Sequence, residues 1–205
     1  MKLLATVVAS AIAVSAAGVA PAQAAGTHFL LEGDFGVGTT DAAVATYVAG
    51  GTLGYGGKFR GFPVIFYLVA DYSRSAAQDE LTSSVSLAER SSSQDVLAFG
   101  PRLYIPVARN VRVFLQGSIG FAWVQSDWVV NDIEKYSAQD SRLATEVSGG
   151  IQARLAPWLS LGAGVQRMSF WGDEPDQSAA AFAGFSQGLD DSDQIRCIGM
   201  LAIHF

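Results

Sequence analysis

The charged side chains of this 205-residue chain are few, and their spacing gives them the clearest capacity for chemistry. Charged residues make up 16% of the sequence against 50% hydrophobic residues, and the formal net charge is −6. Acidic and basic residues recur at every second position within apolar segments, a spacing typical of one face of a β-strand. The residues on this face are Glu32, Asp34, Lys58, Asp71, Arg102, Arg112, Glu146, Arg154 and Arg196. Groups of opposite charge on one face form ion pairs, and in a channel they select ions.

The two histidines, His28 and His204, are the side chains best suited to acid–base catalysis. They lie near the two ends of the chain, and neither belongs to a His-x-Ser pattern. A hydrolase of the Ser-His-carboxylate type needs a serine within hydrogen-bonding reach of the histidine, and the sequence beside either histidine suggests none. We therefore expect hydrogen bonding at the rim of the fold, and we predict no catalytic site.

Side chains that hold metals or cofactors are poorly represented. Cys197 is the single cysteine, so no internal disulfide can form, and its neighbours indicate a small apolar side chain rather than a nucleophile. The acidic segments 172–176 and 190–193 offer carboxylate oxygens to Ca²⁺, but neither has the twelve-residue pattern of an EF-hand. We expect solvated charge there, no metal and no cofactor. The chain has no basic patch, and we predict no nucleic-acid partner.

Eight segments with period-two alternation are the elements that must position the charged residues. They span residues 28–38, 51–61, 64–72, 95–107, 111–124, 143–155, 159–170 and 195–205. Alternation of this kind predicts strands with one apolar face and one more polar face. Aromatic residues lie toward the strand ends, where rings form belts at membrane interfaces. They are Tyr55, Phe59, Tyr72, Trp123, Trp158 and Trp171.

The connections between these strands alternate between short and long. Short turns are predicted at 61–63, 107–110 and 156–158, and long, mostly acidic loops near 38–50, 74–94, 125–142 and 171–193. Short turns at one end and long loops at the other are typical of barrels that span an outer membrane, with the loops outside. In lipid a sheet must close on itself to pair all of its backbone. We therefore predict an all-β, eight-stranded antiparallel up-and-down transmembrane barrel.

Two other folds are compatible with eight strands. A lipocalin-like soluble barrel carries its apolar residues inside and a polar exterior, which the charged inner face contradicts. A β-sandwich does not explain why short and long connections alternate. For the membrane barrel, eight strands leave an interior just wide enough for side chains, so we expect opposite charges to pair and plug it. A narrow ion-conducting pore is the alternative.

The first 24 residues have the pattern of a secretory signal peptide. Lys2 precedes an apolar stretch that runs from Leu3 to about Val19, and Ala22-Gln23-Ala24 forms a small-residue cleavage site. We expect cleavage after Ala24 or Ala25, which leaves a single barrel domain over residues 25–205. The remaining chain has no apolar stretch of about eighteen residues that would make a spanning helix.

The last strand ends on an aromatic residue, with apolar residues at every second position before it: Leu201, Ile203 and Phe205. This ending resembles the carboxyl-terminal signature by which barrel-assembly machinery recognises its substrates. The layout of residues 25–205 resembles the small eight-stranded barrels of the OmpA/OmpX type. The resemblance implies a monomer in the outer membrane, in contact with its lipids and lipopolysaccharide, with a structural or surface-interaction role. Some barrels of this shape modify lipid A, and such an enzyme is the third alternative.

Overall fold

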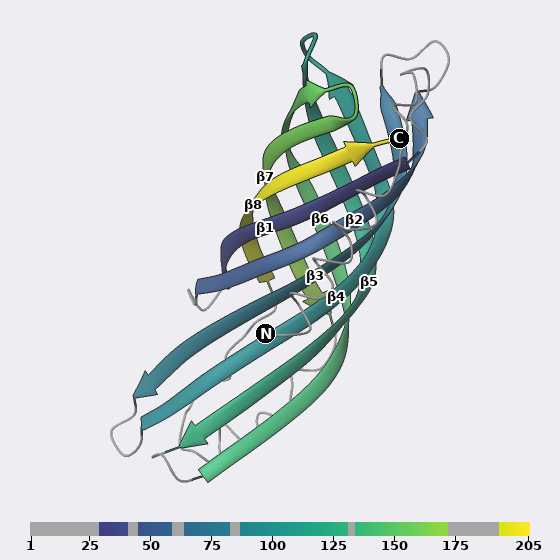
Figure 1. Cartoon of the computed structure of the whole chain (residues 1–205). Coiled ribbons are helices and arrows are strands. Elements are labelled where there is room, and N and C mark those ends of the chain that lie inside the picture. Colours follow the sequence, from purple (N-terminus) through teal and green to yellow (C-terminus); the bar gives the residue numbers. More distant parts are fainter. Residues whose placement is uncertain (1–28, 41–44, 59–63, 83–86, 131–133, 172–192) are drawn as a thin grey trace.

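Eight antiparallel strands close into a barrel in the order of the sequence, and β8 returns to pair with β1 (Figure 1). The structure is a computed structural model that describes residues 29–40, 45–58, 64–82, 87–130, 134–171 and 193–205. The strands are β1 (Phe29–Thr40), β2 (Ala45–Lys58), β3 (Ile65–Thr82), β4 (Leu87–Pro106), β5 (Val111–Val130), β6 (Glu134–Ala156), β7 (Leu159–Trp171) and β8 (Asp193–His204). The predicted eight-stranded antiparallel barrel is confirmed. The predicted signal peptide and His28 lie outside the described residues.

The described part of the chain contains no helix that is long and apolar enough to cross a membrane. Along each strand, exposed and buried side chains alternate as period-two spacing requires. On β1, for example, Phe35 is 65% exposed on the outer face, whereas Glu32 is 2% exposed on the inner face. Most outward side chains in the barrel wall are therefore apolar, and most buried charged ones point inward, the reverse of a soluble barrel.

The hydrogen-bond register fixes how far the strands are staggered. Partners followed once around the barrel, from Tyr67 through Arg102, Gln116, Ser148, Gln166, Arg196, Gly38 and Thr46, return to β3 at Ala77, ten residues from residue 67. A stagger of this size tilts the strands of an eight-stranded barrel by about 35–45°. Because the strands are tilted, inner side chains that are far apart in the sequence meet at one level of the lumen.

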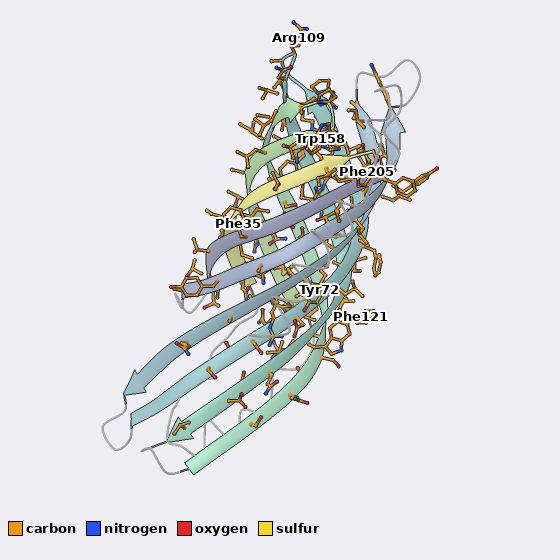
Figure 2. The ribbon with its side chains drawn as sticks, viewed as in Figure 1. Phe35, Tyr72, Arg109, Phe121, Trp158 and Phe205 are labelled. Carbon is orange, nitrogen blue, oxygen red and sulfur yellow. The ribbon has the colours of Figure 1, made fainter. Side chains whose placement is uncertain are left out.

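The outer face carries a continuous band of apolar residues, here called the apolar belt. On β5 it runs through Leu115, Ile119 and Phe121, which are 52%, 56% and 61% exposed. The belt ends at Leu97 on β4 and at Leu143 on β6, and the next outward residues on those strands are polar. Figure 2 shows Trp158 and Arg109 toward the end with the short turns, and Tyr72 and Phe121 toward the other end. The apolar belt covers about ten residues of each strand and has aromatic rings toward both ends, which is the length and pattern of a strand that spans a membrane.

Four strands continue well past the apolar belt, and this corrects the predicted loop boundaries. β3 and β4 remain paired to Thr82 and Leu87, and β5 and β6 remain paired to Val130 and Glu134. The segments 74–94 and 125–142 are therefore mostly paired strand, and β3–β6 project beyond the other four strands (Figure 1). These extensions are rich in serine, glutamine and acidic residues, and their apolar residues do not recur at every second position, so they lack the pattern from which the strands were predicted. The predicted loop 171–193 lies almost entirely outside the described residues.

Apolar side chains share the lumen with the polar ones. One buried cluster, toward the short turns, contains Leu30, Tyr67, Val69, Tyr104, Phe114, Ile198, Met200 and Ala202. A second contains Val96, Ala98, Ala122, Ala144, Met168 and Phe170. Two inward glycines make room for the Phe114 ring, because a Cβ atom on Gly150 or Gly164 would lie 2.7 or 2.9 Å from its carbons. Apolar side chains therefore pack against one another at two levels of the interior.

Candidate functional site

Arg102 on β4 is the centre of a buried network inside the barrel. Its guanidinium Nη1 donates to Glu32 Oε1 at 2.5 Å, and Nη2 lies 3.8 Å from Asp71 Oδ1. Arg102 also donates to the Tyr104 hydroxyl at 3.2 Å and to the side-chain oxygen of Gln116. Both Arg102 and Glu32 are almost fully buried. A buried pair of this kind is tolerated only when further hydrogen bonds satisfy the remaining donors and acceptors, as they do here.

The network extends from Arg102 toward β2, β3 and β6. Thr52 donates to Asp71 Oδ1 at 2.5 Å. The amide nitrogen of Gln116 donates to Asp71 Oδ2 at 2.8 Å and to Glu146 Oε1 at 3.0 Å. One uncharged side chain therefore links two carboxylates that would otherwise repel each other.

A second branch runs toward the short turns. Gln152 donates to Glu32 Oε2 at 2.9 Å and accepts a hydrogen bond from Arg112 Nη2 at 2.5 Å. Arg112 also donates to Ser160 Oγ at 3.2 Å and contacts Nε2 of His204. Its guanidinium carbon lies 4.2 Å from the centre of the Tyr104 ring, which is a cation–π contact.

Arg196 on β8 is the centre of a second set of buried hydrogen bonds, in the part of the lumen nearest the projecting strands. Its guanidinium is fully buried and donates to the side-chain oxygens of Ser73, Ser75, Gln166 and Gln194, at 2.7 to 3.4 Å. Gln194 in turn donates to Gln94 at 2.7 Å. Hydroxyl and amide oxygens of β3, β7 and β8 thus solvate this charge, and Gln94 of β4 joins through Gln194.

The structure places most of the predicted lumen residues inside the barrel but separates three of them from the network. Asp34 is half-buried, and its Oδ1 has no hydrogen-bond partner among the described residues. Lys58 is exposed at the end of β2 and makes none of the buried contacts described above. Arg154 is half-buried near the end of β6. Lys58 and Arg154 have the inward parity, but a side chain at a strand end reaches solvent past the rim.

Several members of the network were not predicted. Gln116, Gln152 and Tyr104 join the charges although the sequence only marks them as inward positions. Arg142 was assigned to a loop, but it is buried on β6, and its Nε lies 2.9 Å from Asp140 Oδ2. The signal that could have found these residues is inward parity combined with a long hydrogen-bonding side chain.

The described residues contain no group of three or more histidine, cysteine, aspartate or glutamate side chains placed to hold a metal ion. The acidic segments 172–176 and 190–193 lie outside the described residues, apart from Asp193. Cys197 is exposed on the outer face of β8, where it pairs with Val37 of β1 and Val165 of β7.

Comparison with known proteins gives matches in fold. No family model matches the chain, and no curated protein matches its sequence. Among solved structures, Neisserial surface protein A superposes with a TM-score of 0.50 at 9% identity, covering 88% of this chain and 99% of that one. The outer membrane enzyme PagL superposes with a TM-score of 0.51 at 10% identity, covering 84% and 98%. This chain has the fold of the small outer-membrane β-barrels.

Ser160 and His204 are the residue types of a nucleophile and its general base, so their contact can be compared with a catalytic triad. Ser160 Oγ lies 3.2 Å from His204 Nε2, a pair that sequence reading missed because β7 and β8 bring the residues together. Arg112 competes for the same nitrogen, and His204 Nδ1 has no hydrogen-bond partner among the described residues. A catalytic triad orients Nδ1 with a carboxylate and exposes its serine to substrate, whereas Ser160 is fully buried. The geometry of this pair is that of a buried packing contact at the end of the lumen.

Proposed function

We propose that this chain is an integral outer-membrane protein whose barrel is plugged by its own side chains and whose role is structural or surface-interacting. The observation that carries this proposal is the continuity of the polar network around Arg102. It takes a residue from every strand: Glu32, Thr52, Asp71, Arg102, Gln116, Gln152, Ser160 and His204. A hydrogen-bonded layer that crosses the whole lumen leaves an ion no hydrated path.

The projecting part of β3–β6 supports the surface role. Where its outward side chains are described, most are polar, such as Gln78, Gln125 and Ser137, so it does not belong in lipid, and it continues beyond the apolar belt. If the short turns face the periplasm, this sheet stands on the cell surface. In this proposal the barrel anchors the sheet, and the chain performs no catalysis.

A narrow cation pore is the second candidate, and one observation favours it. Asp34 Oδ1 and Glu146 Oε2 are buried carboxylate oxygens without hydrogen-bond partners among the described residues. Carboxylates in a lumen attract cations and would line such a path.

Current recordings in planar bilayers distinguish the two candidates. We expect no stepwise current from the purified, heat-modifiable protein, because the Arg102 layer is closed. The proposal fails if steps appear whose cation selectivity falls in the Glu146→Gln variant, which replaces a carboxylate with one unpartnered oxygen by a neutral amide. Arg109→Gln on the exposed β4–β5 turn is the matched control, since its side chain lies outside the lumen.

Export and assembly complete the proposal. We propose that residues 1–24 are removed, that the chain resides as a monomer in contact with outer-membrane lipids and lipopolysaccharide, and that Leu201, Ile203 and Phe205 are read by the barrel-assembly machinery. Supporting this, Leu201 is 47% exposed, and the Phe205 backbone pairs with Phe29 at 3.1 and 3.2 Å, which places the chain end at the β1–β8 closure. The mass of the mature protein from membranes tests the cleavage: an intact residue 1 refutes it.

A further inference from the structure

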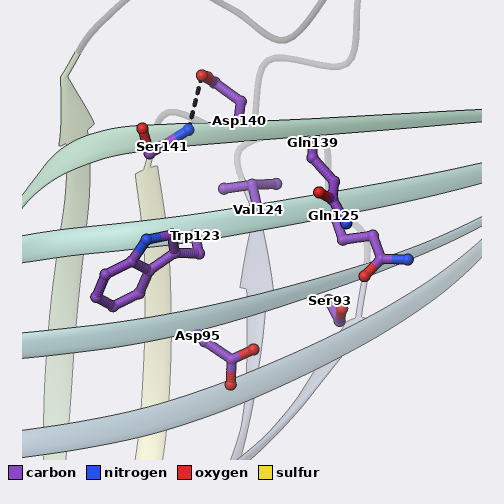
Figure 3. A pocket seen from close by; sticks show the side chains of 8 residues that line it. All are labelled: Ser93, Asp95, Trp123, Val124, Gln125, Gln139, Asp140 and Ser141. Carbon is purple, nitrogen blue, oxygen red and sulfur yellow. Dashed lines mark hydrogen bonds between the residues drawn. The ribbon is translucent and has the colours of Figure 1, made fainter.

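The outer wall of β4, β5 and β6 is hollowed where the apolar belt ends (Figure 3). The hollow has a volume of about 430 Å³. It is lined by Ser93, Asp95, Trp123, Val124, Gln125, Gln139, Asp140 and Ser141. The Arg102 network and the plugged lumen do not use the outward side chains among these.

The register places the outward members in two adjacent rows. Asp95, Trp123 and Ser141 pair across β4, β5 and β6, and Ser93, Gln125 and Gln139 form the next row away from the belt. On the other side, the row next to Trp123 is Leu97, Phe121 and Leu143, which is the edge of the apolar belt. A polar hollow therefore adjoins an apolar surface on the same three strands, and a ligand that covers both must be amphiphilic.

The side chains that line the hollow indicate which polar group of the ligand would bind there. The Trp123 side chain is 49% exposed and offers an apolar ring face beside polar neighbours. Asp95 is held in place because Tyr72 donates a hydrogen bond to its Oδ1 at 2.5 Å, and Arg74 Nη1 lies 3.9 Å from its Oδ2. The side chains of Gln125 and Gln139 each supply both donors and acceptors.

Charge argues against a phosphate in the hollow. Neither lysine nor arginine is among the residues that line it, whereas phosphate recognition relies on such cations or on clustered backbone amides. A carboxylate and two amides around an aromatic ring instead fit a neutral ligand with many hydroxyl groups. A pyranose ring has this character, since its C–H face covers an aromatic ring while its hydroxyls form hydrogen bonds at the edge.

We propose that this hollow binds the neutral saccharide headgroup of a membrane glycolipid, with the acyl chains lying along Leu97, Phe121 and Leu143. The inference rests on the proposed surface role of the projecting strands, and it names a partner for it. Trp123 supplies the stacking surface, and Asp95, Gln125 and Gln139 supply the hydrogen bonds.

Lipid selectivity tests the proposal. The full mature chain is reconstituted into nanodiscs that contain equal amounts of phosphatidylcholine, phosphatidylglycerol and monoglucosyl diacylglycerol, and retained lipids are counted by native mass spectrometry. We expect the glucolipid to be retained about threefold or more over phosphatidylcholine. The Trp123→Ala and Gln125→Ala variants should lose this preference. Trp158→Ala, which removes another exposed tryptophan at the short-turn end, should keep it.

Three outcomes overturn the proposal. Equal retention of all three lipids shows that the hollow is not selective, and a preference for phosphatidylglycerol shows that it recognises charge. Displacement of the glucolipid by millimolar free maltose shows that the hollow takes soluble saccharides and that the acyl chains are not part of recognition. Variants are compared only after each shows heat-modifiable gel mobility. A protein that selects no glycolipid but conducts no current refutes this inference and leaves the plugged barrel standing.

Discussion

At the scale of single residues, Arg102 decides whether the lumen charges are compensated. Its removal leaves Glu32 and Asp71 facing each other in a buried site, and Gln116 loses the donor that orients it. Uncompensated buried charge costs far more than the net stability gained from a pair. The main effect of removing Arg102 is therefore that the buried carboxylates of Glu32 and Asp71 lose their compensating charge.

We predict that Arg102→Met destabilises the barrel by about 3–5 kcal/mol, because a buried carboxylate loses its partner. Urea titration in micelles, followed by tryptophan fluorescence, measures the free energy of unfolding. The double variant Arg102→Met with Glu32→Gln should recover part of that loss, since the neutral amide no longer needs a cation. The exposed Arg109→Met is the control, with an expected change within about 0.5 kcal/mol. Equal losses in the single and double variants would contradict the pairing.

At the scale of elements, the β3–β4 hairpin consists of two parts with different partners. Up to Ala77, β3 pairs with β2 on one side and β4 on the other. Beyond Ala77 it pairs only with β4 among the described strands, out to Thr82. The outer part of the hairpin therefore takes no part in closing the barrel.

Shortening this hairpin should leave the barrel intact. Residues 79–90 are replaced by Asn-Gly, so that Gln78 and Ser91, which are register partners, flank a two-residue turn. We expect the variant to keep strand-type circular dichroism and heat-modifiable mobility, because every β2–β3 hydrogen bond remains. The matched control replaces residues 65–76 by Asn-Gly, which removes the part of β3 that pairs with β2, and it should abolish folding. Loss of mobility in the first variant would show that the projection supports closure.

At the scale of the whole molecule, the distribution of outward apolar side chains indicates which part of the barrel contacts lipid and which part contacts water. The outer face between the short turns and the Leu97–Phe121–Leu143 row is apolar, and most outward side chains described beyond that row are polar. This arrangement sets the position of the barrel along the membrane normal, because apolar area is moved out of water and polar area remains in it.

A charge scan along β5 tests this position. Ile119→Arg, within the belt, should destabilise the barrel by about 2–4 kcal/mol in lipid vesicles, whereas Asp127→Arg, beyond it, should change the stability by about 0–1 kcal/mol. Reversible unfolding in guanidinium, with both variants in the same lipid, gives the two values. Similar costs at the two positions would mean that the membrane boundary lies elsewhere.

Local pattern alone determined the fold class of this protein. Alternation along eight segments, with charged residues such as Glu32 and Arg196 on the inner parity, predicts strands and their faces, since the side-chain period of a strand is two. Short turns between strands 2 and 3, 4 and 5, and 6 and 7 predict antiparallel neighbours. Closure follows because lipid offers no partners to an open edge.

Tertiary structure alone decided which inner residues meet and how far the strands run. The contact of Arg102 with Glu32, 70 positions away, depends on the ten-residue stagger around the barrel, and the contact of His204 with Ser160 depends on the register between β7 and β8. No local pattern encodes either of these. Lys58 is exposed although its parity is inward, because parity gives the face of a side chain but not its depth. Arg142 was assigned to a loop because the strand around it lacks apolar alternation. β3–β6 extend beyond their predicted ends because backbone pairing continues between polar residues, where the hydrophobic signal of a strand is absent.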